Sequence, residues 1–312
     1  MAPCSPKLPT KFKIRSISLP PRSHPTTLRV EEHLNSLKSS LSSSSSPPPP
    51  PSVESLCSAL SSLADLYQSL DDLLQLPLTQ QALSQHYHHH HKRFDHLLDG
   101  PVRFLDILGN TRDSILSMEE GVRHLQSALR RRKLGDSTVL DAHVSAYWNL
   151  RKNARKNSTK SIILLKQIDA SLETFLPPDL NAHLSAVVRV LTEASLVTGS
   201  VFYSLLAFLS SPVLKSKPNN KWALLSRLMQ KGALVSENQE ANINVLEKAD
   251  FAINSLIVNS ATQDADVAQK IQYANRRLED LVEGIETLEN GLGRLFKHLI
   301  NHRVSFLNVV SL

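Results

Sequence analysis

A long apolar stripe near the C-terminus is the feature that most restricts the fold of this 312-residue chain. Its aliphatic side chains recur at alternating steps of three and four, which places them on one face of an α-helix for three heptads. The stripe consists of Leu278, Leu281, Ile285, Leu288, Leu292, Leu295 and Leu299. Because such a face has to be buried against other helices, the pattern predicts a long packing helix from Asp264 to Val310.

Residues beside this stripe indicate packing within the chain's own fold. Val282 and Phe296 widen the apolar face beyond the narrow seam of a coiled coil, and Gly284 and Gly291 flank it. A wide face next to small residues suits the interior of a helical bundle. We therefore expect intramolecular packing, with a free dimeric coiled coil as the alternative.

The rest of the chain also favours helices. It contains only 9 glycines, which disfavours tight turns and β-hairpins, and no segment alternates with period two for long enough to form a strand. A joint is expected at Gly100-Pro101, with a kink within one continuing helix as the alternative. The helices are expected at about residues 28–41, 53–76, 79–98 (or from 77), 102–133, 137–175, 179–209, 221–258 and 264–310. This order predicts an all-α fold, an elongated antiparallel bundle of long helices.

Composition divides the chain into a tail and a domain. Residues 1–27 are basic, rich in Ser and Pro, and free of Asp and Glu. Ser42–Ser46 and Pro47–Pro51 then form a low-complexity linker, which is typical of an extended spacer and less often of an SH3 ligand. We expect residues 1–52 to be a disordered tail with a short helix at 28–41, and residues 53–312 to form the helical bundle.

The tail carries the sharpest linear motif. Arg15 lies three residues before Ser18, which suits a basophilic kinase, and Pro20 lies two residues after it, which suits capture by 14-3-3 proteins. Phosphorylation of Ser18 would add nearly two negative charges and strong hydrogen-bond acceptors. We therefore expect a phosphorylation switch. Short motifs of this kind also arise by chance.

Positive charge is concentrated in one region. Nine Lys and Arg residues stand against two Asp residues between positions 130 and 160, and the rest of the chain is almost neutral. The second half of this region is expected to lie along a helix and comprises Arg151, Lys152, Arg155, Lys156 and Lys160. Such rows suit an anionic membrane surface or a nucleic-acid backbone, and a solvated outer face is the simpler interpretation. The absence of interleaved aromatic residues argues against specific nucleic-acid recognition.

Residues 194–214 carry no formal charge and are long enough to span a bilayer. Several serines dilute the segment, and its flanks show no basic asymmetry. We favour a helix buried at the centre of the bundle over one inserted in a membrane.

Catalytic and metal-binding patterns are absent from the sequence. There is no Walker loop, dinucleotide fingerprint, nucleophile elbow or Cys-x-x-Cys pair. A histidine run could place imidazoles on one helical face, but no cysteine lies near it and no oriented carboxylate is evident, so a solvated helix explains it better. The run consists of His86, His88, His89, His90, His91 and His96. We expect no enzyme activity, no cofactor, no bound metal and no small-molecule substrate.

Four segments together resemble the plant BYPASS-type proteins, which carry a plant-specific domain of unknown function. They are Arg15–Pro25 (RSISLPPRSHP), Leu76–Leu83 (LPLTQQAL), Leu97–Gly100 (LLDG) with Leu105-Asp106, and Arg294–Asn308 (RLFKHLINHRVSFLN). The resemblance extends from about residue 12 to the C-terminus. It implies a role in root and shoot development through restraint of a mobile root-derived signal, and it supplies no catalytic residue or cofactor.

We therefore expect a non-enzymatic plant regulator or adaptor that binds other proteins through helix surfaces and its tail. The alternative is a peripheral membrane protein that binds anionic lipid through a basic helix. Two cysteines without a disulfide framework favour a reducing compartment. A cytoplasmic location is expected, with membrane association, plastid targeting and nuclear targeting left open.

Overall fold

The computed structural model describes residues 24–42, 51–131, 138–173, 182–211, 243–258 and 264–311, and within these ranges all regular structure is α-helical. The expected all-α bundle is thus confirmed. The helices are α1 (Pro25–Leu41), α2 (Val53–Leu74), α3 (Pro77–Arg131), α4 (Thr138–Glu173), α5 (Ala182–Leu209), α8 (Val245–Val258) and α9 (Asp264–Val310).

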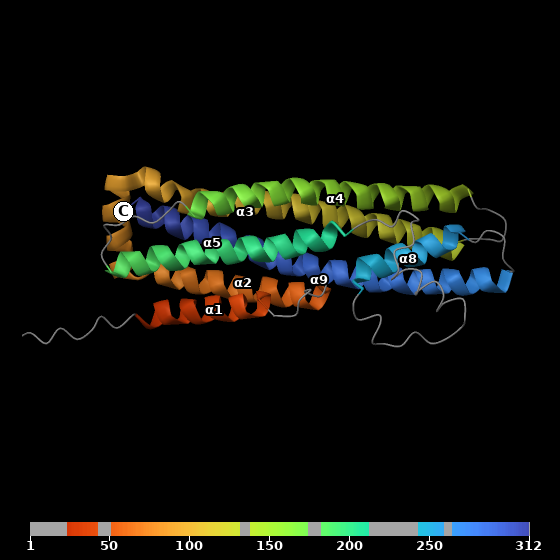
Figure 1. The fold of residues 1–312 in the computed structure, drawn as a ribbon, viewed down its shortest axis with the longest axis horizontal. Helices are drawn as coiled ribbons and strands as arrows, with labels where there is room; N and C mark the ends of the chain where they lie inside the picture. Colours follow the sequence, from red (N-terminus) through yellow and green to blue (C-terminus); the bar gives the residue numbers. More distant parts are fainter. Residues whose placement is uncertain are drawn as a thin grey trace, which may run out of the picture.

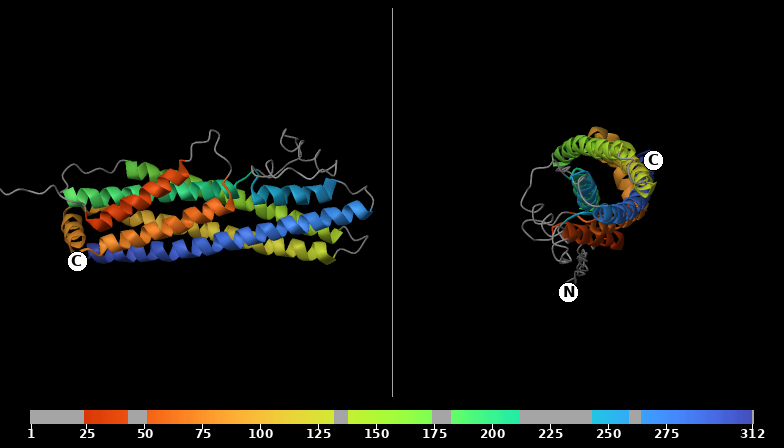
Figure 2. Two further views of the ribbon diagram at one scale, coloured as in Figure 1. Left: turned by 90° about the horizontal axis from the view of Figure 1, so that it is seen from below. Right: turned by 90° about the vertical axis from the view of Figure 1, so that its right-hand side faces the viewer.

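The helices lie side by side along one long axis (Figure 1). Helices α3, α4 and α9 extend over most of its length, and α5 and α8 follow one another in the same direction along the remaining side (Figures 1 and 2). Helices α1 and α2 form a hairpin that packs against α5 and α9 in one half. Consecutive helices from α1 to α5 alternate in direction, so each short connection joins antiparallel neighbours.

Helix α3 continues through Gly100 and Pro101, so the expected joint is not a break between helices. Its ribbon bends at one end of the bundle, and its first turns lie across that end (Figure 2). There the buried Thr79 hydroxyl lies 3.1 Å from Nε2 of His183, in the first turn of α5. The first turns of α3 thereby cover the start of α5.

Other expected boundaries compare as follows. The helix expected at 28–41 begins earlier, at Pro25, because proline is well suited to the first turn of a helix and His24 caps it. Helix α9 has the bounds expected from its pattern. Of the helix expected at 221–258, residues 243–258 are described, and the helix there is Val245–Val258.

The stripe of α9 is buried along its whole length, and none of its seven side chains is more than 2% exposed. Helices α2, α3 and α8 surround it, which explains why the apolar face is wider than a coiled-coil seam. A Cβ at Gly284 would come within 3.2 Å of Val53, and one at Gly291 within 3.2 Å of Leu60. Because both glycines face α2, the two parallel helices can approach closely at these points.

Helix α5 is, among the described helices, the one long and apolar enough to cross a membrane by composition. It packs against α1, α2, α3 and α4, and 61% of its most apolar window is buried inside the bundle. The hydroxyls of Ser195 and Thr198 donate to backbone carbonyls one turn earlier in the same helix, at 3.1 and 2.7 Å. The polar side chains that dilute the segment are therefore compatible with its central position.

Substitution of Leu292 by Ala should lower the free energy of unfolding by about 2–5 kcal/mol, because it opens a cavity between α9 and its neighbours. The matched control is Ile300→Ala on the same helix, where the side chain is 38% exposed, with an expected loss of about 1 kcal/mol or less. Urea unfolding followed by far-UV circular dichroism measures both. Equal losses would contradict the central position of the stripe.

Candidate functional site

Helix α4 carries the basic residues that the sequence predicted to form a site. A regular row of buried residues forms its inner face. Buried residues recur at steps of four and three along the helix and turn one face toward α3, α5 and α8. The row comprises Leu140, Val144, Tyr147, Arg151, Ala154, Ser158, Ser161, Leu165 and Ile168. A charged residue, Arg151, thus occupies a core position.

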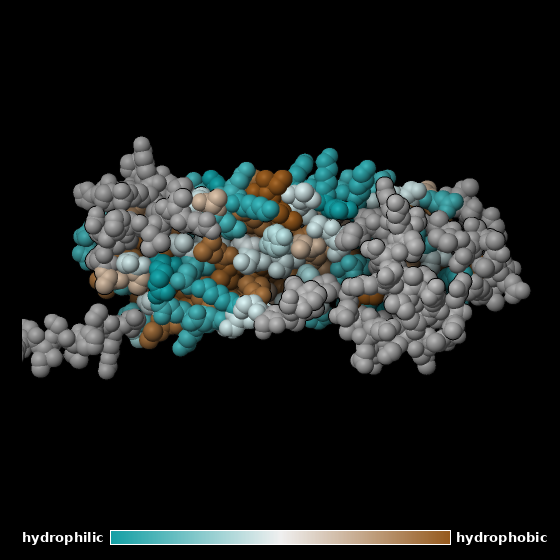
Figure 3. Space-filling view, viewed as in Figure 1, coloured by the Kyte–Doolittle hydropathy of each residue, from teal (hydrophilic) through white to brown (hydrophobic). Residues whose placement is uncertain are grey.

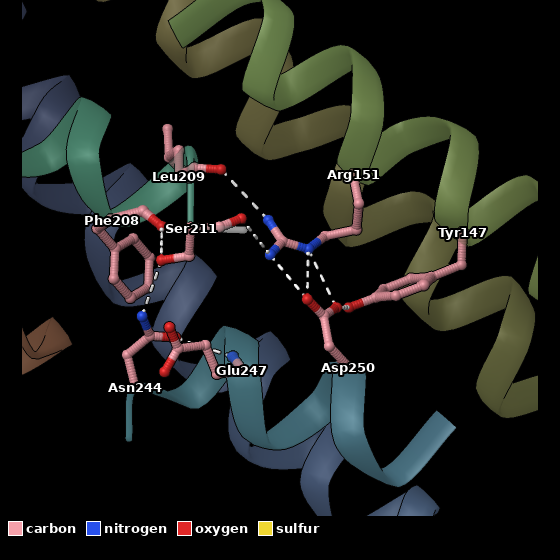
Figure 4. A network of polar contacts seen from close by, with 8 residues as sticks. All are labelled: Tyr147, Arg151, Phe208, Leu209, Ser211, Asn244, Glu247 and Asp250. Carbon is pink, nitrogen blue, oxygen red and sulfur yellow. Dashed lines mark hydrogen bonds and ion pairs between the residues drawn. The ribbon is translucent and has the colours of Figure 1, made fainter. Parts of the chain in front are cut away.

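The prediction that Arg151 contributes to an anionic-surface site is wrong. Its side chain is 0% exposed and forms an ion pair with Asp250 of α8, which is equally buried (Figure 4). Nη2 donates to Oδ2 at 2.8 Å, and Nε lies 3.1 and 3.2 Å from the two carboxylate oxygens. The hydroxyl of Tyr147 donates to Oδ1 at 2.6 Å. We call these three residues the buried ion-pair cluster.

This cluster lies where α5 ends and α8 begins. Arg151 also donates to the backbone carbonyls of Leu209 and Ser211, at 3.2 and 3.4 Å, and so caps the C-terminal end of α5. Asn244 donates through Nδ2 to the Ser211 hydroxyl at 2.9 Å, and its Oδ1 accepts from the backbone N–H of Glu247 as the N-cap of α8 (Figure 4). One side chain of α4 thereby contacts both the end of α5 and α8.

Electrostatics favour a charged Arg151 and a neutral Tyr147 within the cluster. Burial, together with the adjacent Asp250 carboxylate, raises the pKa of Tyr147 well above its ordinary value, so the phenol stays protonated and donates. Burial raises the pKa of Asp250, and the guanidinium and phenol that bond to it act in the opposite direction. Burial also disfavours the charge on Arg151, but the carboxylate outweighs it and raises its pKa. Every member is engaged in joining helices.

A second buried polar cluster joins α2, α5 and α9. Nδ1 of His302 lies 2.9 Å from Oδ1 of Asp71, and the edge of the Tyr67 ring packs against the imidazole. The Tyr67 hydroxyl in turn lies 3.0 Å from the Thr198 hydroxyl. The adjacent cavity has a volume of about 10 Å³, which holds at most a single water. His302 continues the α9 row beyond Leu299, and that spacing could have identified it from the sequence.

The remaining basic residues of the predicted site do lie on the outside. Lys152, Arg155, Lys156 and Lys160 are all exposed, and none of them forms an ion pair with another described residue. The structure therefore separates the predicted group into one core residue and four exposed cations.

The tail motif of Arg15, Ser18 and Pro20 lies outside the described residues. The same holds for the side chains of His88–His91 and His96, whereas His86 is partly exposed on α3. Among the described side chains, no group of three or more His, Cys, Asp or Glu is placed to hold a metal ion.

Comparison with known proteins identifies one family. A family model described as Protein BPS1 matches residues 59–309, which covers the bundle from the first turns of α2 to the end of α9 and leaves out α1 and the tail. No curated protein and no solved structure matches the chain.

Removal of one partner of the buried ion pair should be far more damaging than removal of both. Asp250→Ala leaves a buried guanidinium and should lower the free energy of unfolding by about 3–5 kcal/mol. The double variant Arg151→Met with Asp250→Leu should be less destabilised than Asp250→Ala alone. Tyr147→Phe, which removes one hydrogen bond, should lose about 1 kcal/mol. Urea unfolding measures each variant together with the single variants Arg151→Met and Asp250→Leu, and a loss in the double variant equal to the sum of the two single losses would show that the two charges are not coupled.

Proposed function

The chain belongs to the BPS1 family of BYPASS-type proteins and is thus a plant developmental regulator, and we propose that it acts as a non-enzymatic adaptor in root and shoot growth. In this proposal the bundle is a rigid rod whose outer helix faces bind other proteins. The N-terminal tail adds a contact that phosphorylation switches on. No cofactor and no small-molecule substrate take part.

The main support comes from how the buried ionisable groups are used. The buried ion-pair cluster joins α4, α5 and α8, and the pair of His302 and Asp71 joins α9 to α2. In both clusters the polar atoms bond to one another or to helix ends, so their evident role is to hold helices together. Other molecules would then be recognised by the outer surface of the bundle.

Helix α1 gives the tail a defined point of attachment. It buries Thr27, Val30, Leu34 and Leu37 against α2 and α5. Ion pairs reinforce this contact, from Arg29 to Asp72 at 2.5 Å and from Lys38 to Glu193 at 2.7 Å. Because Ser18 lies only a few residues before α1, a protein that captured its phosphorylated form would be held beside the bundle.

A cytoplasmic location suits this role, because basophilic kinases and 14-3-3 proteins act there. Attachment to a membrane from the cytoplasmic side is compatible with it. Plastid and nuclear targeting remain alternatives, and microscopy of the full chain fused at its C-terminus would distinguish them.

The tail switch predicts a strict dependence on Ser18. The full chain, phosphorylated by a basophilic kinase, should bind purified 14-3-3 protein, and Ser18→Ala should abolish that binding. Arg15→Ala should reduce phosphorylation, whereas Pro20→Ala should leave phosphorylation intact and weaken binding. Quantitative phosphorylation and fluorescence polarisation measure the two steps separately.

Ser16→Ala is the matched control, since it removes a neighbouring hydroxyl and should behave as the unmodified chain. In plants, Ser18→Ala should fail to restore growth in a line that lacks the protein. Normal growth with unchanged partners in pull-downs would remove the tail from the mechanism.

A further inference from the structure

The outer face of α4 carries a run of cations that the fold leaves unneutralised. We call it the cationic face and define it as Lys152, Arg155, Lys156, Lys160 and Lys166, all of which are exposed. The sequence contains no Asp or Glu between Asp141 and Asp169. None of the five side chains forms an ion pair with any described residue.

Several exposed cations on other helices are neutralised within the fold. Arg130 of α3 pairs with Glu279 of α9 at 2.9 Å, and Lys38 of α1 pairs with Glu193 of α5 at 2.7 Å. Such pairs form where two helices meet, whereas the cationic face lies opposite the buried row of α4. Its charges therefore have no partner within the described bundle and are available to an external one.

Two large apolar side chains interrupt this charged surface. Ile163 is 55% exposed and Leu164 is 42% exposed. The helical period places Ile163 on the same row as Lys152, Lys156 and Lys160, so the lysine row ends in an aliphatic side chain. Figure 3 shows an apolar patch flanked by hydrophilic side chains at the edge of the molecule that α4 forms.

A neighbouring aromatic residue extends the same surface. Tyr203 of α5 is 52% exposed and, with Lys166, lines a groove of about 510 Å³ between α1, α4 and α5. Tyrosine is enriched where protein meets the headgroup layer of a bilayer, because its ring is apolar and its hydroxyl is polar. The surface thus combines lysines, exposed aliphatic side chains and an exposed phenol.

We propose that the cationic face, together with Ile163 and Leu164, docks the protein on anionic phospholipid membranes. The cations would lie against lipid phosphates and carboxylates, and the two aliphatic side chains would enter the layer below the headgroups. A solvated face or a nucleic-acid contact needs no exposed aliphatic pair beside the lysines. The proposal goes beyond the adaptor role and does not depend on the tail switch.

This contact also sets an orientation. The row from Lys152 to Ile163 spans about 16 Å along α4 at roughly 1.5 Å per residue. Because α4 runs along one side of the elongated bundle, contact along this row lays the long axis parallel to the membrane (Figure 1). The remaining sides of the bundle then stay accessible to protein partners.

Sedimentation of the full chain with vesicles tests the electrostatic part. The chain should bind vesicles of phosphatidylcholine and phosphatidylserine and should not bind phosphatidylcholine alone. The variant Lys152→Glu, Lys156→Glu, Lys160→Glu should lose at least about tenfold in affinity. The control Arg103→Glu, Lys297→Glu, Arg303→Glu makes the same change in net charge at exposed positions on α3 and α9 and should retain more of the binding. Equal losses in the two triple variants would overturn the proposal.

The aliphatic pair has its own test. The variant Ile163→Ser, Leu164→Ser keeps every charge and should bind anionic vesicles about tenfold or more weakly. In about 1 M salt the Debye length is about 3 Å, so the attraction between charges is screened and the unmodified chain should bind only weakly, through its apolar side chains. The serine variant should lose this remaining binding. Thermal melts by circular dichroism confirm that each variant is folded. If the serine variant binds vesicles normally, or if the chain binds a mixed-sequence RNA duplex more tightly than anionic vesicles, the membrane is the wrong partner.

Discussion

Burial of the apolar face of α9 is the constraint on which the rest of the bundle depends. The face is continuous from Leu278 to Leu299, and one neighbouring helix would not be wide enough to cover it. Helices α2, α3 and α8 together cover this face of α9. Close approach is allowed at Gly284 and Gly291, where α2 packs directly onto the backbone of α9. Helices α1, α4 and α5 pack mainly on α2, α3 and one another.

Polar residues inside the bundle determine which helices contact each other and in which register. An apolar row can slide past another row by a turn at modest cost, but a buried guanidinium needs its carboxylate at one specific position. Arg151 therefore fixes α4 against both α5 and α8. The pair of His302 and Asp71 fixes α9 against α2 in the same way. The two clusters lie in different parts of the bundle and together set its register.

Most of the helical architecture could be predicted because leucine spacing reports burial directly. The bounds of α9 and the central position of α5 follow from that spacing and from the shortage of glycine. Arg151 was misplaced because it was grouped with nearby charges, although its spacing from Val144, Tyr147 and Ile168 puts it on the inner row. Its partner Asp250 lies about a hundred residues further along the chain, and spacing within one helix carries no information on pairing at that distance.

The separation between the core cation and the outer cations has a simple physical origin. Along α4 the inner row advances by alternating steps of four and three, and every basic residue off that row stays in water. Ile163 and Leu164 also fall off the row, which explains how aliphatic side chains come to be exposed on a helix with a well-packed inner side. The sequence pattern alone shows their position on the helix, but only the packing of the described helices shows that both side chains stay exposed.

The hydrogen bond between Asn244 and Ser211 holds the end of α5 beside the start of α8. Arg151 binds at the same place, to the backbone carbonyls of Leu209 and Ser211 and to the carboxylate of Asp250. The end of one helix, the start of another and a side chain of a third thus converge on one buried point. A change at any of these groups should be felt by all three helices at once.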